Sequence, residues 1–314
     1  MGDLKFGIEI SITAESLKRI CVKAEDLGYN FIFYGDSLSY NSLECWTAIS
    51  AISLVTKSIR VGPSMTFLSY RHPAVLARAS ATIDRLSSGR LELRMGIGGR
   101  ALKRDSRTYG VPFPPYHQRV ERLDEGLTLM KKLWTLKKSS QRGKYFSSSN
   151  AAQIIKPIQR PHPPITIAGI SEKVLDLVIK HANVWEVGGV VPAEYRNLRQ
   201  TLISKCKNRG RNVSSIEMSL EVTIGLFTRG GDAIDGLRRK LGNKFDKLAK
   251  RWTLIAGPPD HIISELNKFV ELGIERFSIY FINYNGMNLF FHRPTLLIDQ
   301  MEIFREQVIP YLKH

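Results

Sequence analysis

Glu9 is the first residue of this chain whose type and position could support catalysis. It lies near the end of Lys5–Ile10, an apolar run of strand length. Because side chains alternate between the two faces of a strand, the spacing can turn a carboxylate such as Glu9 toward a partly desolvated interior, where it can give or take a proton. The alternative is a structural carboxylate that is solvated or ion-paired at a strand end.

Asp36, Arg71 and His72 are further candidates for contact with a ligand. Asp36 follows the apolar run Phe31–Tyr34, where it either contacts a ligand or caps the next helix. Arg71 and His72 stand directly before a predicted helix that begins at Pro73. His72 has no second histidine at metal-ligand spacing, and the chain has no G-x-S-x-G elbow, so we predict neither a metal site nor a serine hydrolase.

Two glycine-containing segments follow predicted strands. Gly96 and Gly98 belong to a run that resembles no Walker or dinucleotide fingerprint, so a close backbone approach to a ligand and a plain tight turn are both open. Gly169, Ile170 and Ser171 stand between a strand and a helix, where backbone N–H groups and a hydroxyl can bind a phosphate. The alternative for Ser171 is a simple helix cap.

The composition is that of one globular, intracellular protein. With 314 residues, of which 43% are hydrophobic, the chain can form the core of one large domain, residues 1–314. No apolar run is long enough for a membrane span, and the first residues lack the order of a signal peptide. Cys21, Cys45 and Cys206 are too far apart in sequence to suggest a zinc site or a disulfide framework. We therefore expect a cytoplasmic location.

The chain is strongly basic, with 46 Lys and Arg against 29 Asp and Glu and a formal charge of +17. Such a charge raises the question of an anionic partner. The basic residues recur along the whole chain and form no separate arm. We therefore expect a solvated basic surface first, steering of an anionic ligand second, and nucleic-acid binding last.

Strand-length apolar runs alternate with helical patterns along the chain, which is typical of a parallel α/β fold. The predicted strands are Lys5–Ile10, Phe31–Tyr34, Ile59–Met65, Leu91–Ile97, Ile165–Ala168, Val184–Val187, Met218–Ile224 and Phe277–Phe281. The predicted helices are Glu15–Leu27, Glu44–Val55, Pro73–Leu86, Tyr116–Leu136, Glu172–His181, Ala193–Asn208 and Pro259–Leu272. Eight such strands, alternating with helices, predict a (β/α)8 TIM barrel.

Three segments interrupt this alternation. Gly98–Pro115, after the fourth strand, and Ser139–Pro164, before the fifth, are rich in Gly, Pro, Ser and Arg, so we interpret them as insertions without a helix interior. In a barrel, loops that follow strands surround the active site, so the first insertion should help to form a pocket. Gly230–Arg251 is interpreted as a basic helical stretch.

Several passages together resemble the luciferase-like superfamily of flavin and deazaflavin enzymes. The passage Thr82–Arg90, followed by a strand and Gly98-Gly99, carries the most specific part of this resemblance. The others are Ala24–Tyr29, Arg71–Ala77, Pro163–Gly169 and Ala256–Asp260. The superfamily includes monooxygenases that use FMN and hydride transferases that use coenzyme F420, and both cofactors therefore remain open.

The first strand and Gly62–Thr66 resemble the coenzyme F420-dependent methylenetetrahydromethanopterin reductases. This resemblance implies that Glu9 is catalytic, and that Gly62, Ser64 and Met65 hold the coenzyme ring around a non-prolyl cis peptide between Ser64 and Met65; an ordinary trans strand end is the alternative. It further implies coenzyme contacts by Asp36 and by the two glycine-containing segments, a small organic substrate, and a homodimer or tetramer. The alternatives are an FMN-dependent monooxygenase and, from another class, a non-catalytic barrel that binds flavin or nucleic acid.

Overall fold

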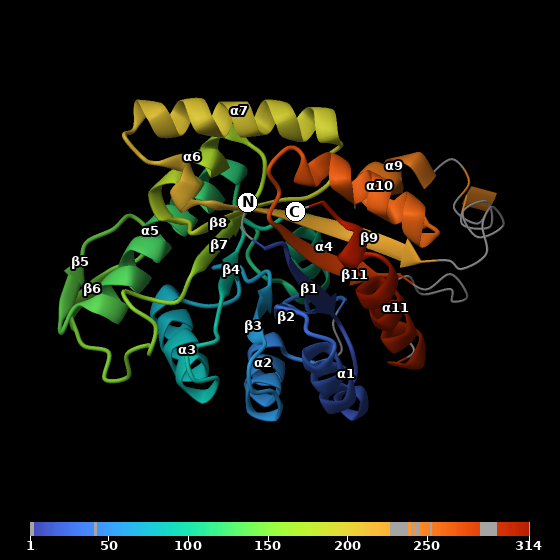
Figure 1. Ribbon diagram of the computed structural model, residues 1–314. Coiled ribbons are helices and arrows are strands. Elements are labelled where there is room, and N and C mark those ends of the chain that lie inside the picture. The colour runs from blue at the N-terminus through green and yellow to red at the C-terminus, as the bar shows by residue number, and fades with distance from the viewer. Residues whose placement is uncertain are drawn as a thin grey trace. The chain divides into compact units, whose positions relative to one another are not determined.

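The computed structural model describes residues 3–40, 43–226, 238–239, 242, 245–251, 253–282 and 294–313. Figure 1 labels its helices and strands. The chain divides into two compact units. The first unit contains Met1–Ile32 and Val184–His314, and the second contains Phe33–Asn183. We describe each unit separately.

The first unit contains parallel strands from both ends of the chain. Strand β11 pairs with β1 on one side and with β9 on the other, and β9 also pairs with β8 and β10. The strands are β1 (Lys5–Ile10), β8 (Val184–Val187), β9 (Glu217–Leu226), β10 (Leu254–Gly257) and β11 (Arg276–Phe281). The helices are α1 (Ala14–Asp26), α7 (Pro192–Asn208), α9 (Phe245–Arg251), α10 (Pro259–Val270) and α11 (Pro294–Gln307), with short 3-10 turns at Val213–Ser215 and Ile309–Tyr311.

Aromatic side chains fill the core where β1 meets β11. The rings of Phe6 and Phe277 stack with their centroids 5.5 Å apart, and Phe304 of α11 meets Phe6 edge to face. A Cβ at Gly7 would lie 1.7 Å from the Phe31 ring, so only glycine leaves room for this aromatic side chain.

The second unit combines parallel strands with a short antiparallel hairpin. Strands β4 and β7 pair in parallel, and isolated parallel bridges join Val61 to Leu91 and Thr66 to Met95. The strands are the greater part of β2 (Phe31–Gly35), β3 (Arg60–Ser64), β4 (Leu93–Met95), β7 (Ile165–Ala168) and the hairpin strands β5 (Ser139–Gln141) and β6 (Ser148–Ala151). The helices are α2 (Cys45–Val55), α3 (Pro73–Leu86), α4 (Arg100–Tyr109), α5 (Tyr116–Thr135) and α6 (Glu172–His181).

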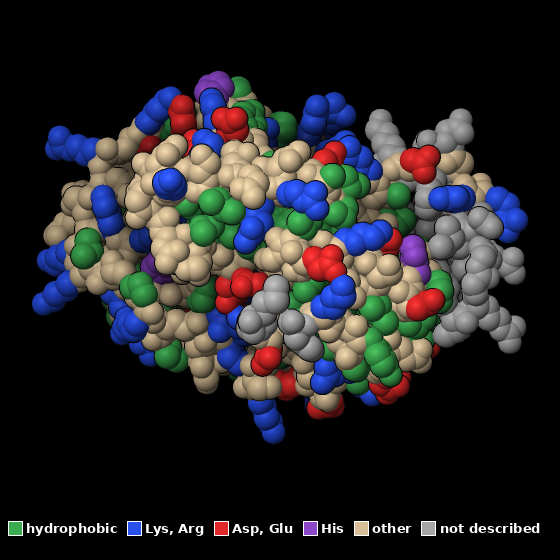
Figure 2. Space-filling model, turned by 45° about the horizontal axis from the view of Figure 1, so that its top comes forward, with side chains coloured by type: hydrophobic (Ala, Val, Ile, Leu, Met, Phe, Trp, Pro, Cys, Tyr) green, Lys and Arg blue, Asp and Glu red, His purple; other side chains and the backbone are tan. Residues whose placement is uncertain are grey.

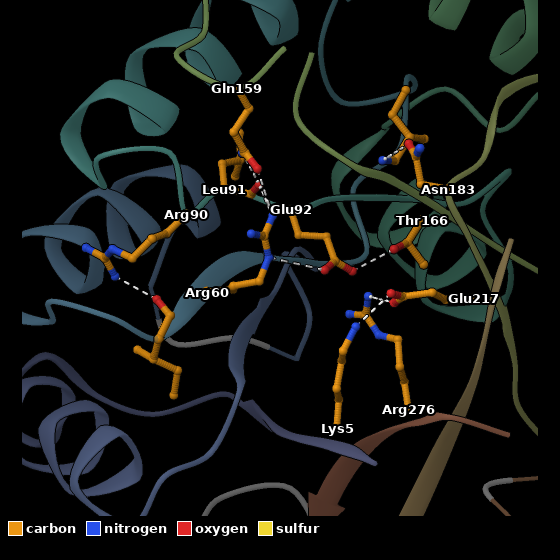
Figure 3. A network of polar contacts seen from close by, with 12 residues as sticks. Lys5, Arg60, Arg90, Leu91, Glu92, Gln159, Thr166, Asn183, Glu217 and Arg276 are labelled. Atoms are coloured by element: carbon orange, nitrogen blue, oxygen red, sulfur yellow. Dashed lines mark hydrogen bonds and ion pairs between the residues drawn. The ribbon is translucent and has the colours of Figure 1, made fainter. Parts of the chain in front are cut away.

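Ion pairs occupy the amino ends of strands in each unit. Figure 3 shows Arg60 and Thr166 turned toward Glu92 in the second unit; Glu92 is 1% exposed and accepts a 2.7 Å hydrogen bond from the Thr166 hydroxyl. In the first unit, Glu217 accepts from Lys5 at 2.7 Å and from Arg276 at 2.9 Å (Figure 3). Burial alone would raise the pKa of Glu217, but these two cations lower it. Buried charges at these ends are therefore paired.

The passage Thr82–Arg90, which carries the family resemblance, fastens two loops. The Asp84 carboxylate accepts from the backbone N–H groups of Ile158 and Gln159 at 2.6 and 3.0 Å. The Arg90 guanidinium donates to the carbonyl oxygens of Ser53, Thr56 and Ile59 at 2.7 to 3.0 Å. Asp84 thus satisfies N–H groups of a loop, and Arg90 satisfies carbonyl oxygens in the last turn of α2 and in the loop that follows it.

All eight predicted strands and all seven predicted helices occur, with ends that shift by at most two residues. The prediction that Gly98–Pro115 lacks a helix interior is wrong, because α4 occupies Arg100–Tyr109. Its glycines and prolines lie outside the helix: Gly98 and Gly99 precede it, and Gly110 ends it with a φ of +71°.

The second insertion and the C-terminal part also contain elements that were not predicted. Strands β5 and β6 lie within Ser139–Pro164, and β10 and α11 were not foreseen. Of the predicted basic stretch Gly230–Arg251, the structure describes Arg238–Arg239, Gly242 and α9, whereas residues 230–237, 240–241 and 243–244 lie outside the described residues.

The basic side chains are dispersed on the surface that Figure 2 shows, where Lys and Arg are scattered among other residues. This view agrees with the even spread of basic residues along the sequence. None of the described helices combines the length and the apolar character that a membrane span requires.

Candidate active site

Asp36 binds an arginine directly after β2 in the second unit. Its side chain is 7% exposed and accepts from the Thr66 hydroxyl at 2.6 Å. Arg71 donates from Nη1 to Oδ2 at 2.6 Å and from Nη2 to Oδ1 at 3.1 Å. Burial raises the pKa of Asp36, while the Arg71 charge opposes this rise. The bidentate geometry fixes both side chains in the second unit.

Arg71 also binds Glu44, which begins α2. The Glu44 carboxylate accepts from the backbone N–H and the hydroxyl of Thr47, both at 2.8 Å, and therefore caps the helix. Burial would raise the pKa of Glu44, but the hydrogen bonds from Thr47 and Arg71 lower it. The cap that the sequence analysis considered for Asp36 is thus formed by Glu44, and Asp36 is left to bind Arg71 and Thr66.

A pocket of about 470 Å³ opens beside this group. Its volume is in the range of small-molecule sites. Carboxylates, hydroxyls and one guanidinium share the lining with apolar side chains, which is the mixed character expected of a site for a small polar molecule. Asp36, Glu44, Tyr70, Arg71 and Val111 are among the residues that line it.

Asp105 of α4 holds the loop that follows β2. Its carboxylate accepts from the Ser37 hydroxyl at 3.0 Å and from the backbone N–H groups of Leu38 and Ser39 at 3.0 and 2.9 Å. The Tyr70 hydroxyl also donates to Asp105. Burial would raise the pKa of Asp105, but these donors lower it. Sequence analysis missed this residue because it lies in the segment interpreted as an irregular insertion.

The peptide bond between Ser64 and Met65 is cis, as the family resemblance implied. Two nearby glycines have steric roles. A Cβ at Gly62 would lie 2.1 Å from the carbonyl oxygen of Glu92, so this glycine allows β3 and its neighbour to approach closely. A Cβ at Gly96 would lie 3.2 Å from the Phe67 ring and 3.7 Å from the Met65 sulfur. The structure thus brings Met65 and Gly96 together.

The backbone after β4 is held by Arg119 of α5. Arg119 donates to the carbonyl oxygens of Ile97, at 3.2 Å, and Gly98. Gly98 has a φ of +83°, and a Cβ there would lie 2.3 Å from the Leu102 side chain, so a glycine is required. Burial lowers the pKa of Arg119.

Gly169, Ile170 and Ser171 connect β7 to α6. Gly169 has a φ of +137°, a conformation that favours glycine, and the Ile170 side chain is 44% exposed. The Ser171 hydroxyl does not cap the helix; it lies 2.5 Å from the Tyr116 hydroxyl. The segment therefore offers a pair of hydroxyls beside a helix N-terminus.

His72 and its neighbour Arg71 have different roles. Its Nδ1 accepts from the Ala74 backbone N–H at 3.2 Å and caps α3, and its ring meets Phe146 edge to face. The contact with coenzyme or substrate considered for His72 gains no support from this geometry. Arg71, by contrast, lines the pocket.

Glu9 belongs to a group of three carboxylates in the first unit. One carboxylate oxygen from each of Glu9, Glu186 and Glu221 lies within 4.8 Å of the other two. Glu9 and Glu186 are 8% and 1% exposed, and Glu186 accepts from the hydroxyls of Ser219 and Ser278 at 3.0 and 2.9 Å. Three carboxylate oxygens at this spacing could bind a cation or pass a proton.

Sequence analysis missed Glu186 and Glu221. The available signal was an acidic residue inside the apolar strand Val-Trp-Glu-Val and another in the alternating strand that begins at Glu217. Acidic residues in such strands are rarely buried without a partner. Sequence alone did not show that the two strands bring these carboxylates to Glu9.

Comparison with known proteins identifies the family. The model of the luciferase-like monooxygenase family matches residues 7–241. The chain belongs to this family. The superfamily predicted from the passage Thr82–Arg90 and its companions is therefore confirmed.

One curated relative matches the luciferase-like chain along almost its whole length. This protein, the F420-dependent glucose-6-phosphate dehydrogenase of Microbacterium testaceum (strain StLB037), is 24% identical; the match covers 99% of this chain and 98% of the relative.

Two solved structures show the fold of this luciferase-like protein. An F420-dependent secondary alcohol dehydrogenase, in complex with an F420–acetone adduct, superposes with a TM-score of 0.82 at 18% identity and covers 100% of both chains. The coenzyme F420 dependent tetrahydromethanopterin reductase from Methanopyrus kandleri gives 0.81 at 18% identity, over 99% of this chain and 100% of the other. The predicted (β/α)8 fold is thereby confirmed.

Proposed function

We propose that the chain is an oxidoreductase that transfers a hydride between coenzyme F420 and a small organic substrate. One observation carries this proposal: the relative that matches the chain almost end to end is named as F420-dependent. The two structural neighbours bear the same coenzyme in their names. The carboxylate group around Glu9 and the strand-end backbone of the second unit support it independently.

The second unit has features that fit a flat ring with an anionic tail. Gly96 has no side chain beside Met65 and Phe67, which suits the close approach of a ring to the backbone. The hydroxyls of Ser171 and Tyr116, which precede α6 and begin α5, suit a phosphate. When bound, the coenzyme supplies the carbon that gives or takes the hydride.

Glu9 is proposed as the group that holds or delivers the proton in this reaction. Reduction of a carbonyl, an imine or a bridging methylene requires a proton at the oxygen or nitrogen when the hydride arrives at carbon. Glu9 is 8% exposed and lies within 4.8 Å of a carboxylate oxygen of Glu186 and of Glu221, so a proton can pass among these oxygens to the substrate. Glu186 keeps its orientation through Ser219 and Ser278.

The proposed substrate class is a small carbonyl, alcohol, imine or reduced pterin, including methylenetetrahydromethanopterin. The pocket of about 470 Å³ beside Asp36 and Arg71 supports a small polar molecule. The family resemblance supports a homo-oligomer as a further proposal, and the length and composition support one functional domain across residues 1–314 and a cytoplasmic location.

A second candidate is an FMN-dependent monooxygenase, because the matching family model describes luciferase-like monooxygenases. The two candidates differ in their coenzyme and in their use of oxygen. A monooxygenase consumes oxygen with reduced FMN, whereas the proposed F420 enzyme reduces or oxidises its substrate without oxygen.

The deciding experiment titrates the purified protein with oxidised and reduced F420 and FMN and follows fluorescence at two salt concentrations. We expect tight binding of F420 and weak binding of FMN. Preference for FMN, with oxygen consumption, would move the assignment to the monooxygenase. Binding of neither coenzyme would overturn the proposed oxidoreductase.

A further inference from the structure

Helix α4 presents four cations on one face. Arg100, Lys103, Arg104 and Arg107 have the spacing i, i+3, i+4 and i+7, and all four are exposed. None of them forms an ion pair with an acidic side chain in the part of the chain that the structure describes. Arg104 lies 4.8 Å above the Tyr40 ring. Three cations of this face, Arg100, Lys103 and Arg107, therefore face solvent without a counter-charge among the described residues.

The opposite face of α4 fixes this orientation. Leu102 and Asp105 are fully buried, and Asp105 binds the loop after β2 through Ser37, Leu38 and Ser39. These contacts hold the helix on its buried side, so the cations remain outward. The orientation of α4 is therefore fixed within the second unit, because buried contacts on its opposite face determine it.

The location of α4 indicates which kind of ligand its cations contact. The helix begins five residues after Met95, the last residue of β4, so it lies at the carboxyl edge of this unit's parallel strands. Ligands of parallel α/β folds bind at this edge. The four cations extend over roughly 10 Å of helix, which suits several anionic groups in a row better than one.

We propose that the cationic face of α4 is a subsite for a small molecule that carries two or more phosphate or carboxylate groups. The molecule is a ligand of the active-site edge, with its anionic part on the coenzyme or on the substrate. This inference rests on the proposed function only in the choice of ligand, because the charge and the geometry of α4 are independent of it.

The test compares two triple variants of the full chain. R100Q/K103Q/R107Q removes three α4 cations and leaves Arg104 on Tyr40. K137Q/K138Q/K207Q removes the same charge from exposed lysines elsewhere. Inorganic tripolyphosphate is titrated by calorimetry and coenzyme F420 by fluorescence at low salt, and circular dichroism confirms that both variants fold.

We expect the α4 variant to bind tripolyphosphate about tenfold more weakly than the natural chain, because each exposed ion pair contributes a factor of roughly two to five. The control variant should change little. A parallel loss of F420 affinity in the α4 variant would support the subsite and assign the anionic groups to the coenzyme. Unchanged F420 affinity with the same loss for tripolyphosphate would support it and assign them to the substrate.

Two results would overturn the subsite: equal weakening in both variants, or no tripolyphosphate binding by the natural chain. An α4-dependent gel shift with a single-stranded oligonucleotide, without tripolyphosphate binding, would replace it with a nucleic-acid surface. Failure of the natural chain to bind F420 while tripolyphosphate still binds through α4 would sink the proposed function and leave the subsite standing.

Discussion

At the scale of single residues, the distinctive feature is that reactive groups occur in partnerships formed by distant parts of the sequence. Glu9 lies beside Glu186 and Glu221, and Asp36 lies beside Arg71. Each partnership determines what the side chain can bind. The consequences of single substitutions therefore depend on the partners left behind.

Replacement of Glu9 by Gln should leave coenzyme affinity near that of the natural chain and lower turnover by about 10²- to 10⁴-fold, because the amide cannot deliver a proton. Turnover is measured as F420 absorbance with an active carbonyl, alcohol or pterin substrate. Glu15→Gln, at an exposed position of α1, is the matched control. Full activity of Glu9→Gln would exclude Glu9 as the proton donor.

Replacement of Asp36 by Asn should lower the free energy of unfolding by about 1–3 kcal/mol at pH 7, because Arg71 loses its bidentate partner while it keeps Glu44. Urea unfolding measures the change, with Asp26→Asn on the exposed end of α1 as the control. Equal stability of the Asp36 and Asp26 variants would contradict a contribution from the buried pair.

The sequence was enough to select the candidate site residues, but it predicted only some of the residues that they contact. Glu9, Asp36 and Arg71 were singled out by their places at strand or helix ends. The bond between Asp36 and Arg71 joins residues on different βα units, and no local periodicity encodes such a contact. Glu186 and Glu221 were missed for the same reason, since the four strands β1, β11, β9 and β8 must pair before these carboxylates meet Glu9.

At the scale of elements, α5 and α6 meet through a buried histidine. His181 at the end of α6 is 6% exposed, and its Nε2 lies 2.6 Å from Asp124 of α5. Lys180 binds the same carboxylate at 2.7 Å. Burial lowers the pKa of His181 from 6.5 to about 4. The helix contact therefore uses neutral histidine at neutral pH.

This contact predicts a loss of stability in mild acid. Between pH 6.5 and 4 the unfolded chain binds a proton at His181 that the folded chain does not, so stability is present above pH 6.5 and falls as the pH decreases. From pH 7 to pH 5 the loss from this residue should be about 2 kcal/mol. Urea unfolding of the natural chain and His181→Gln at both pH values measures it.

The exposed His117 provides the control, since His117→Gln should follow the natural chain at both pH values. The pH-dependent change in the free energy of unfolding that is absent from His181→Gln is then assigned to the buried His181 ring. If His181→Gln and the natural chain lost the same free energy between pH 7 and pH 5, the buried neutral histidine would not be the cause.

Most elements could be predicted because their apolar periodicity is strong. The exceptions have identifiable reasons. Strands β5 and β6 are short and serine-rich, so they have no apolar alternation, and β10 ends on Gly257 and lies directly after the segment that was interpreted as a basic helical stretch. Helix α4 is highly charged and flanked by glycine and proline, which led the whole segment to be interpreted as irregular. The only sign of a helix in this sequence was that Leu102 and Asp105 are three residues apart, between cations with helical spacing.

At the scale of the whole molecule, the formal charge of +17 sets the response to salt. Like charges across a surface repel one another in the compact state, and salt screens that repulsion over a Debye length of about 10 Å at 0.1 M. The charge is dispersed over the face in Figure 2. The effect of this net charge on the free energy of unfolding is therefore a sum over many residues and cannot be assigned to one of them.

The free energy of unfolding should rise by about 1 kcal/mol between 10 and 200 mM sodium chloride, because screening relieves the repulsion more in the compact chain than in the expanded one. Urea unfolding at constant pH measures it, with an equal osmolality of glycerol as the uncharged control. A fall in stability over this range would show that attractive ion pairs outweigh the net repulsion.

The pairing of β1 with β11 has a consequence for the order in which the chain can fold during synthesis. Lys5 pairs in register with Arg276, and the first unit needs residues from both ends, whereas the second unit is one uninterrupted segment. At about 5–20 residues per second, β1 leaves the ribosome on the order of 10–50 s before β11. During this interval the edge of β1 that later pairs with β11 is unpaired, although the second unit can already be complete. A chaperone that shields nascent strands would act in this interval.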